Sequence, residues 1–148
     1  TNAFRLKDDL NKPELTYPLR IMVCEECWLV QTVDFVDAEE LFNPEYAYFS
    51  STSSSWLNHS KKYSEMITKR LELNADSFVV EVASNDGYLL NNFIEDSIPC
   101  LGIEPTKSTA DAAEKLGIPV ERKFFGKSLG EELAEAGKQA DLIIGNNV

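Results

Sequence analysis

Residues 77–87 read SFVVEVASNDG, and this stretch decides the fold class. Its first seven residues form a nearly continuous apolar run, which is typical of a β-strand that is covered on both faces. The SNDG that follows is typical of a turn, and GYLLNNFIED at 87–96 then predicts a helix. A buried strand that passes through a short turn into a helix indicates an α/β protein.

The same alternation continues to residue 148. It predicts further strands at 99–105, 118–124 and 140–147, with helices at 107–117 and 126–137 between them. Strands that alternate with helices of about ten residues form βαβ units with right-handed crossovers and a parallel sheet. We therefore expect residues 77–148 to form the first half of a nucleotide-binding α/β fold.

Two smaller units precede this one. Residues 15–36 predict two short strands folded back around Cys24-Glu25-Glu26-Cys27, which is a β-hairpin with a cysteine knuckle. Residues 45–56 show neither helical nor strand periodicity and are predicted to be a loop, and apolar residues at three- and four-residue steps predict a helix over 56–73. The expected division of the chain is a cysteine module at 1–45, a linker loop and helix at 46–76, and the α/β unit at 77–148.

Composition excludes several classes of protein. The formal charge of -11, from 25 acidic and 14 basic residues, would repel a phosphate backbone, so we expect no nucleic acid partner. No apolar run reaches the roughly 20 residues that cross a bilayer, and the first residues lack the apolar core of a secretory signal, so we expect a cytoplasmic protein without a membrane partner. The chain has no initiator Met and stops on an apolar strand pattern, which predicts a fragment interrupted at both ends.

The turn after the first strand is the expected ligand site, because ligands of open α/β sheets bind beyond the carboxyl ends of the strands. Acidic side chains there can pair with a cationic group, and the free N–H groups of the next helix suit a carboxylate. The turn has one glycine instead of the three of a dinucleotide-binding loop, which favours a cofactor without phosphates. The candidate residues are Glu81, Ala83, Ser84, Asn85, Asp86 and Gly87.

A second candidate set follows the other strands. Glu104 ends the second strand 18 residues after Asp86, where an acid can accept hydrogen bonds from ribose hydroxyls, and Pro105 follows it. Phe125 is placed to stack on an adenine ring, and Asn146 ends the fourth strand. The plainer alternatives are that Asp86 and Glu104 only cap helices, and that Phe124 and Phe125 belong to the core.

Several segments in this order resemble the family of S-adenosylmethionine-dependent sugar C-methyltransferases from deoxysugar pathways. They are YPLRIMVCEECWLVQ at 17–31, YFSSTSSSWLNHSKKYSEM at 48–66, VVEVASNDGYLL at 79–90, LGIEPT at 101–106, FFG at 124–126 and ADLIIGNNV at 140–148. The SNDG turn and the EPT triplet are much more specific than a generic methyltransferase glycine motif.

The resemblance implies an architecture. It predicts part of a Rossmann-like class I methyltransferase sheet, preceded by a β-hairpin zinc-knuckle module and, in the family, followed by a domain that completes the sugar site. The family carries two Cys-x-x-Cys pairs, of which this chain has Cys24 and Cys27. Because structural zinc takes four ligands, we expect this pair to need ligands from a further segment or another chain. The alternative is a redox pair or two buried thiols.

The resemblance also implies a reaction, the transfer of a methyl group to carbon, expected at C3, of a nucleotide-linked 4-keto sugar. A base removes the proton beside the ketone, and the resulting enolate attacks the sulfonium methyl. Tyr48 is the candidate hydrogen-bond partner of the sugar, with packing between modules as the alternative. His59 is a catalytic candidate, although a lone surface histidine is usually solvated. The family's general base is expected beyond residue 148, so we expect this chain to bind cofactor weakly without turnover.

Two other classes of function remain open at this point. One is a non-catalytic metal-binding or assembly module, and the other is a nicotinamide-dependent sugar oxidoreductase, which the single-glycine loop disfavours. The sequence does not indicate which sugar is used, nor the oligomeric state.

Overall fold

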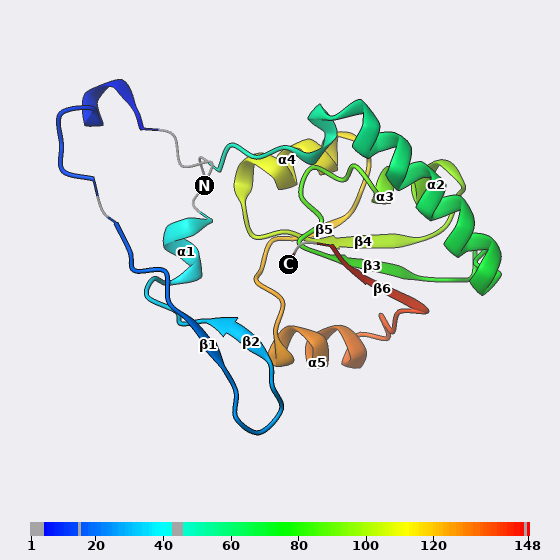
Figure 1. The fold of residues 1–148 in the computed structure, drawn as a ribbon. Coiled ribbons are helices and arrows are strands. Elements are labelled where there is room, and N and C mark those ends of the chain that lie inside the picture. Colours follow the sequence, from blue (N-terminus) through cyan, green and yellow to red (C-terminus); the bar gives the residue numbers. More distant parts are fainter. Residues whose placement is uncertain (1–4, 15, 43–45, 147) are drawn as a thin grey trace.

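The computed structural model describes residues 5–14, 16–42, 46–146 and 148, which form a small hairpin part and a larger α/β unit (Figure 1). The hairpin part holds a two-stranded antiparallel sheet, and the α/β unit holds a four-stranded parallel sheet. The expected fold class, part of a Rossmann-like sheet preceded by a β-hairpin, is confirmed.

The hairpin part contains η1 (Lys7–Asp9), β1 (Ile21–Val23), β2 (Val30–Thr32) and α1 (Ala38–Leu41). The two strands pair antiparallel from Ile21 opposite Thr32 to Val23 opposite Val30, as the hairpin prediction requires. Every residue of both strands is exposed, because a two-stranded ribbon has no second layer to bury its apolar side chains against.

The linker consists of η2 (Ser50–Thr52) and α2 (Ser54–Leu71). The hydroxyl of Ser53 accepts a hydrogen bond from the backbone N–H of Trp56 and caps the start of α2, and Glu72 ends the helix in a left-handed conformation. The helix predicted over 56–73 is confirmed and begins two residues earlier than expected. The turn of 3-10 helix at η2 lies in the stretch predicted to be a loop.

The α/β unit alternates strands and helices as predicted. Its elements are β3 (Val79–Val82), α3 (Leu90–Glu95), β4 (Cys100–Ile103), α4 (Lys107–Lys115), β5 (Val120–Glu121), α5 (Lys127–Glu135) and β6 (Leu142–Gly145). The strand predicted over 118–124 is shortened to two residues, because the chain turns where the N–H of Lys123 bonds to the carbonyl of Glu121.

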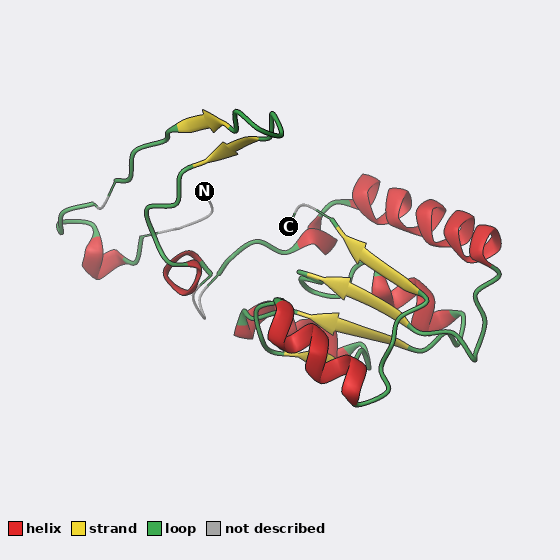
Figure 2. Ribbon diagram, turned by 90° about the horizontal axis from the view of Figure 1, so that it is seen from below, coloured by secondary structure: helices red, strands yellow, loops and turns green. Residues whose placement is uncertain are grey.

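The four strands are parallel and lie in the order β5-β4-β3-β6. The chain therefore moves outward from β3 to β5 and then returns to the other side of β3, which makes β3 and β6 the topological switch point (Figure 2). The chain leaves β3 in one direction across the sheet and returns in the other, and right-handed crossovers then place α3 on one face and α5 on the other (Figure 1). Ligands of such sheets bind at the carboxyl end of the switch point.

Each face of the sheet has its own apolar core. Val79 packs with Leu90 and Phe93 of α3 on one face, and Val80 packs with Leu129 and Leu133 of α5 on the other. Neighbouring residues of β3 thus point to opposite faces, as strand geometry requires. None of the described helices is both long enough and apolar enough to cross a membrane.

Candidate cofactor site

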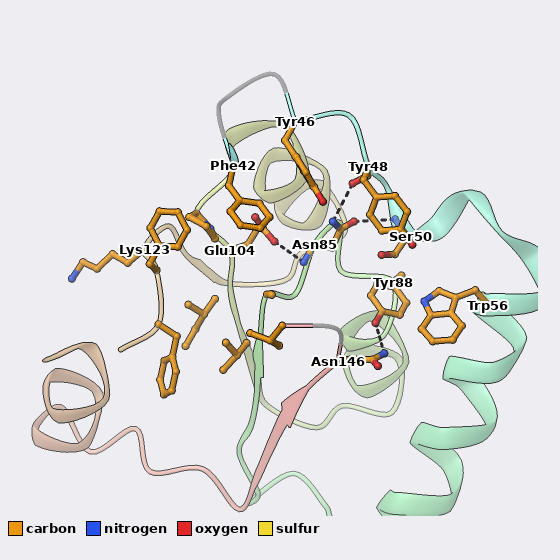
Figure 3. Close-up of a pocket in the computed structure, with 17 residues that line it drawn as sticks. Phe42, Tyr46, Tyr48, Ser50, Trp56, Asn85, Tyr88, Glu104, Lys123 and Asn146 are labelled. Carbon is orange, nitrogen blue, oxygen red and sulfur yellow. Dashed lines mark hydrogen bonds between the residues drawn. The ribbon is translucent and has the colours of Figure 1, made fainter. Parts of the chain in front are cut away.

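A cavity of about 240 Å³ lies at the carboxyl ends of the strands, between the turn after β3 and the linker segment that precedes η2 (Figure 3). Seven residues predicted as site residues line it: Tyr48, Ala83, Asn85, Glu104, Pro105, Phe125 and Asn146. The cavity therefore occupies the place in the sheet where the topology predicts a ligand.

The turn after β3 has an unusual backbone. Ala83, Asn85 and Gly87 all have positive φ, at 55°, 52° and 78°, so every second residue is left-handed. A left-handed conformation costs a residue with a Cβ roughly 1–2 kcal/mol, and such strain is concentrated at functional sites. The turn thus takes up a backbone suited to glycine while two of its three left-handed residues carry side chains.

Gly87 is required by packing inside the fold. A Cβ on Gly87 would lie 2.4 Å from Cδ1 of Ile118 and 3.1 Å from the Cβ of Ala113. Gly87 does not line the cavity, and its lack of a side chain instead lets the turn pack closely against Ala113 of α4 and against Ile118.

Glu104 connects the two neighbouring strand ends. One of its carboxylate oxygens accepts the N–H of Asn85 at 2.9 Å, and the other accepts the N–H and the hydroxyl of Thr106. A carboxylate offers about four acceptor positions, so three are in use and one remains for a ligand. Glu104 thus has room for one ribose hydroxyl, and for a second only if the Thr106 hydroxyl turns toward Thr109, with which it is also in contact.

Glu81 is the most unusual ionisable residue near the site. Its side chain is fully buried, and neither carboxylate oxygen has a hydrogen-bond partner among the described residues. Burial raises its pKa well above the usual value, and the nearby carboxylates of Asp86 and Glu104 add to the rise, while the Tyr88 hydroxyl opposes it. Ionised Glu81 is consequently costly unless a cation approaches.

Tyr88 lines the cavity and also lies near Glu81, since each of the two groups shifts the pKa of the other. Its hydroxyl accepts a hydrogen bond of 2.8 Å from the side-chain amide of Asn146, and its ring stacks on Trp56 with centroids 6.1 Å apart. Burial, with the charge of Glu81 as the second cause, raises the pKa of Tyr88 to about 12. The phenol therefore stays neutral at physiological pH.

Comparison with known proteins indicates the family. Residues 1–42 match a sequence family described as "Putative zinc binding domain". The chain is 30% identical over 132 residues to C-methyltransferase NovU from Streptomyces niveus, an alignment that covers 89% of this chain and 31% of that protein. These two matches support a C-methyltransferase family with an N-terminal zinc-binding module. That recognition from sequence is confirmed.

A second relative carries a different name. The chain is 33% identical over 115 residues to 4-hydroxy-3-methylbut-2-en-1-yl diphosphate synthase (flavodoxin) from Chlamydia caviae, covering 78% of this chain and 18% of that protein. The chain thus spans less than a third of the length of either relative.

The other residues that the sequence predicts for the site do not line the cavity. Glu81 and Ser84 are fully buried beneath the turn, and the hydroxyl of Ser84 faces Gly102 of β4. Asp86 uses one carboxylate oxygen to accept the N–H of Ser51 at 3.0 Å. The ring of His59 stacks on that of Trp56, with centroids 5.1 Å apart, and His59 borders a neighbouring cavity instead of the one that Tyr48 lines. The catalytic role of His59 stays a prediction.

Cys24 and Cys27 lie in the tight turn between β1 and β2. The N–H of Cys24 donates to the carbonyl of Leu29, and the N–H of Trp28 donates back to the carbonyl of Cys24, which closes the knuckle. Among the residues that the structure describes, no group of three or more His, Cys, Asp or Glu side chains is placed to hold a metal ion. A structural zinc site takes four ligands, and these two thiols would make up two of them.

Some of the residues that line the cavity are not predicted from the sequence. Phe42, at the end of α1, reaches the cavity and packs near Tyr46 and Phe124, with ring centroids 5.4 and 6.3 Å away. Trp56 and Tyr88 also line it. Aromatic residues carry no signal that separates a cavity wall from a core, so only the folded structure identifies these two as lining residues.

Proposed function

We propose that this chain provides the cofactor side of an S-adenosylmethionine-dependent C-methyltransferase, whose acceptor is a nucleotide-linked keto sugar. The observation that carries the proposal is the pairing of Glu104 with the strained turn after β3 at the switch point of a parallel sheet. The bound cofactor supplies an electrophilic methyl group on a sulfonium. The chain's own residues bind, orient and shield it.

The adenosine part fits the side of the cavity beside Glu104. The remaining acceptor position of its carboxylate suits a ribose hydroxyl, and Phe124 and Phe125 offer apolar faces to an adenine ring on the same wall. The loop from Ala83 to Gly87 has no run of glycines to wrap a pyrophosphate, which favours an adenosyl cofactor without phosphates over NAD.

The cationic part of the cofactor fits the opposite side. Buried Glu81 lies near Tyr88, and its two carboxylate oxygens and one oxygen of Asp86 are buried without a hydrogen-bond partner among the described residues. An ammonium or sulfonium near Tyr88 would favour the ionised form of Glu81. The faces of Tyr48, Tyr88 and Trp56 add cation–π attraction on this side of the cavity.

We assign binding of the sugar acceptor to the linker. Tyr48 lines the cavity and is partly exposed, so its hydroxyl is available to bind a sugar oxygen. In the proposed reaction a C3 enolate of the sugar attacks the methyl group, and Tyr48 helps to hold the sugar in line. The cavity is below the usual range of about 300–1,000 Å³ for ligand sites, so it would enclose part of the ligand pair.

A thermal-shift comparison tests the binding claim on the 148-residue chain. We expect S-adenosylhomocysteine to raise the unfolding temperature by roughly 5–10 °C at a hundred times its Kd, because a ligand of the native state contributes about 2.7 kcal/mol there. NAD at the same concentration should leave the temperature unchanged. A shift with NAD alone would favour the oxidoreductase, and no shift with either would favour a non-catalytic module.

A further inference from the structure

The linker segment 46–52, here called the strap, is fastened to the cofactor turn by side chains of the α/β unit. The side chain of Asn85 accepts the N–H of Ser50 at 2.9 Å and donates to the carbonyl of Tyr48 at 3.1 Å (Figure 3). Asp86 accepts the N–H of Ser51. Residues 35 or more positions apart in the chain are thus joined at adjacent points.

Asn85 also binds the opposite wall of the cavity. Its backbone N–H donates to the carboxylate of Glu104 at 2.9 Å, so one residue contacts Tyr48 through its side chain and Glu104 through its backbone. The Asn85 side chain is buried, and its carboxamide is one of the few side chains with both an acceptor and a donor at its tip. It is therefore matched to one N–H and one carbonyl of the strap.

The backbone of Asn85 makes this choice of residue informative. At φ 52° glycine would be the unstrained residue, and asparagine is among the residues that tolerate this conformation best. A strained asparagine in place of glycine is explained by a function for its side chain. The described contacts give that side chain a single task, which is to hold the strap.

We propose that Asn85 is a positioning residue that couples the acceptor side of the cavity to cofactor binding. This inference rests on the proposed function. A ligand that engages Glu104 stabilises the turn, the turn holds Asn85, and Asn85 holds the carbonyl of Tyr48 and the N–H of Ser50. Cofactor binding thereby orders the strap before the sugar arrives. The entropic cost of ordering the strap then does not reduce the affinity for the acceptor.

Hydrogen exchange of the Ser50 amide tests the fastening without any ligand. Asn85→Gly suits the left-handed backbone and removes only the side chain, and we expect it to speed exchange at Ser50 at least tenfold. Ser97→Gly is the matched control, because Ser97 is an exposed left-handed residue outside the cavity, and it should change exchange at Ser50 less than twofold. Equal exchange at Ser50 in Asn85→Gly and the wild type would overturn the proposal.

Adding S-adenosylhomocysteine tests the coupling. We expect the ligand to slow exchange at Ser50 in the wild type and to leave it unchanged in Asn85→Gly, while both proteins still bind it. Binding without any effect at Ser50 in the wild type would overturn the coupling and leave the proposed function intact. If the ligand does not bind the wild type at all, the proposed function fails. Fast exchange in ligand-free Asn85→Gly would still show that the Asn85 side chain holds the strap.

Under the proposed function, kinetics of a longer methyltransferase that includes residues 1–148 give a second readout. We expect Asn85→Gly to raise the KM for the sugar acceptor about tenfold and the KM for S-adenosylmethionine less than threefold, because the lost contacts are all on the acceptor side. Asn85→Asp keeps the acceptor for Ser50 but sets a carboxylate oxygen against the Tyr48 carbonyl, so it should not restore acceptor KM. Equal changes in both KM values would contradict a positioning role.

Discussion

The carboxylate of Glu104, at the end of β4, accepts the backbone N–H of Asn85, in the turn after β3, over 2.9 Å. The register of the sheet makes this contact possible, because Val82 pairs with Ile103 and both strands run parallel. The two strand ends that carry the predicted cofactor residues therefore lie at the same edge of the sheet and are bonded to each other.

Glu104→Gln should weaken both the fold and the site. A glutamine side chain has one acceptor oxygen, so the N–H of either Asn85 or Thr106 would face an NH₂ group and lose its partner. We expect a loss of about 1–3 kcal/mol in the free energy of unfolding, measured with urea, and at least a tenfold loss in affinity for S-adenosylhomocysteine. Glu135→Gln, at an exposed position in α5, is the control and should match the wild type in both measurements.

Glu81→Gln should change the pH dependence of stability. The raised pKa of Glu81 means that the folded state holds a proton that the unfolded state releases, so stability falls as pH rises from the unfolded value of about 4.3 through the folded value. We expect the variant to gain stability over the wild type as pH rises, by up to about 1.4 kcal/mol per pH unit in that window. Parallel stability curves from pH 5 to 8 would show that Glu81 titrates normally.

Comparing Gly87→Ala with Gly117→Ala separates the cost of a positive φ from the cost of steric contact at the new Cβ. Both glycines have positive φ, but a Cβ at Gly117 meets nothing within 4 Å, whereas one at Gly87 meets Ile118 and Ala113. Gly117→Ala should therefore cost only the roughly 1–2 kcal/mol of a left-handed alanine, and Gly87→Ala about 1–3 kcal/mol more. Chemical denaturation of the two variants measures the difference, and equal losses would rule out the packing role of Gly87.

Cys100 should be inert toward thiol reagents in the folded protein. It is buried in β4, and burial, followed by the charge of Glu81, raises the pKa of its thiol to about 11. We expect two thiols, Cys24 and Cys27, to react with an aromatic disulfide at pH 8, and the third only in denaturant. A Cys100→Ala variant should keep the fast phase and lose the slow one, and three equally fast thiols in the native wild type would contradict this burial.

The parallel sheet was predictable because its strands and helices each carry a local signal. Val79–Val82 and Cys100–Ile103 are short apolar runs between turns, and this pattern alone sets the order of strands and helices. The strand-end position of Glu104 was predictable for the same reason. Its single spare acceptor position was not, because the contacts with Asn85 and Thr106 depend on the folded turn.

The remaining features depend on contacts that no local pattern encodes. The sequence predicts a cofactor role for Asn85, but its bonds to the strap join residues 35 and 37 positions apart, and nothing near Ala83 signals a left-handed backbone. Glu81 did carry an overlooked signal. It lies two residues after Val79, and alternate residues of a strand share a face, so its side chain lies on the same face of the sheet as that of Val79, which packs against α3.

The central claim is that the turn after β3 and Glu104 together bind an adenosylated ligand, and amide chemical shifts test it most directly. On titration of the chain with S-adenosylhomocysteine, we expect the largest shift changes at the amides of Ala83 to Gly87 and of Glu104 and Thr106, with the hairpin amides of β1 and β2 unmoved. Changes confined to the hairpin, or saturable binding that leaves both strand ends unshifted, would contradict the account.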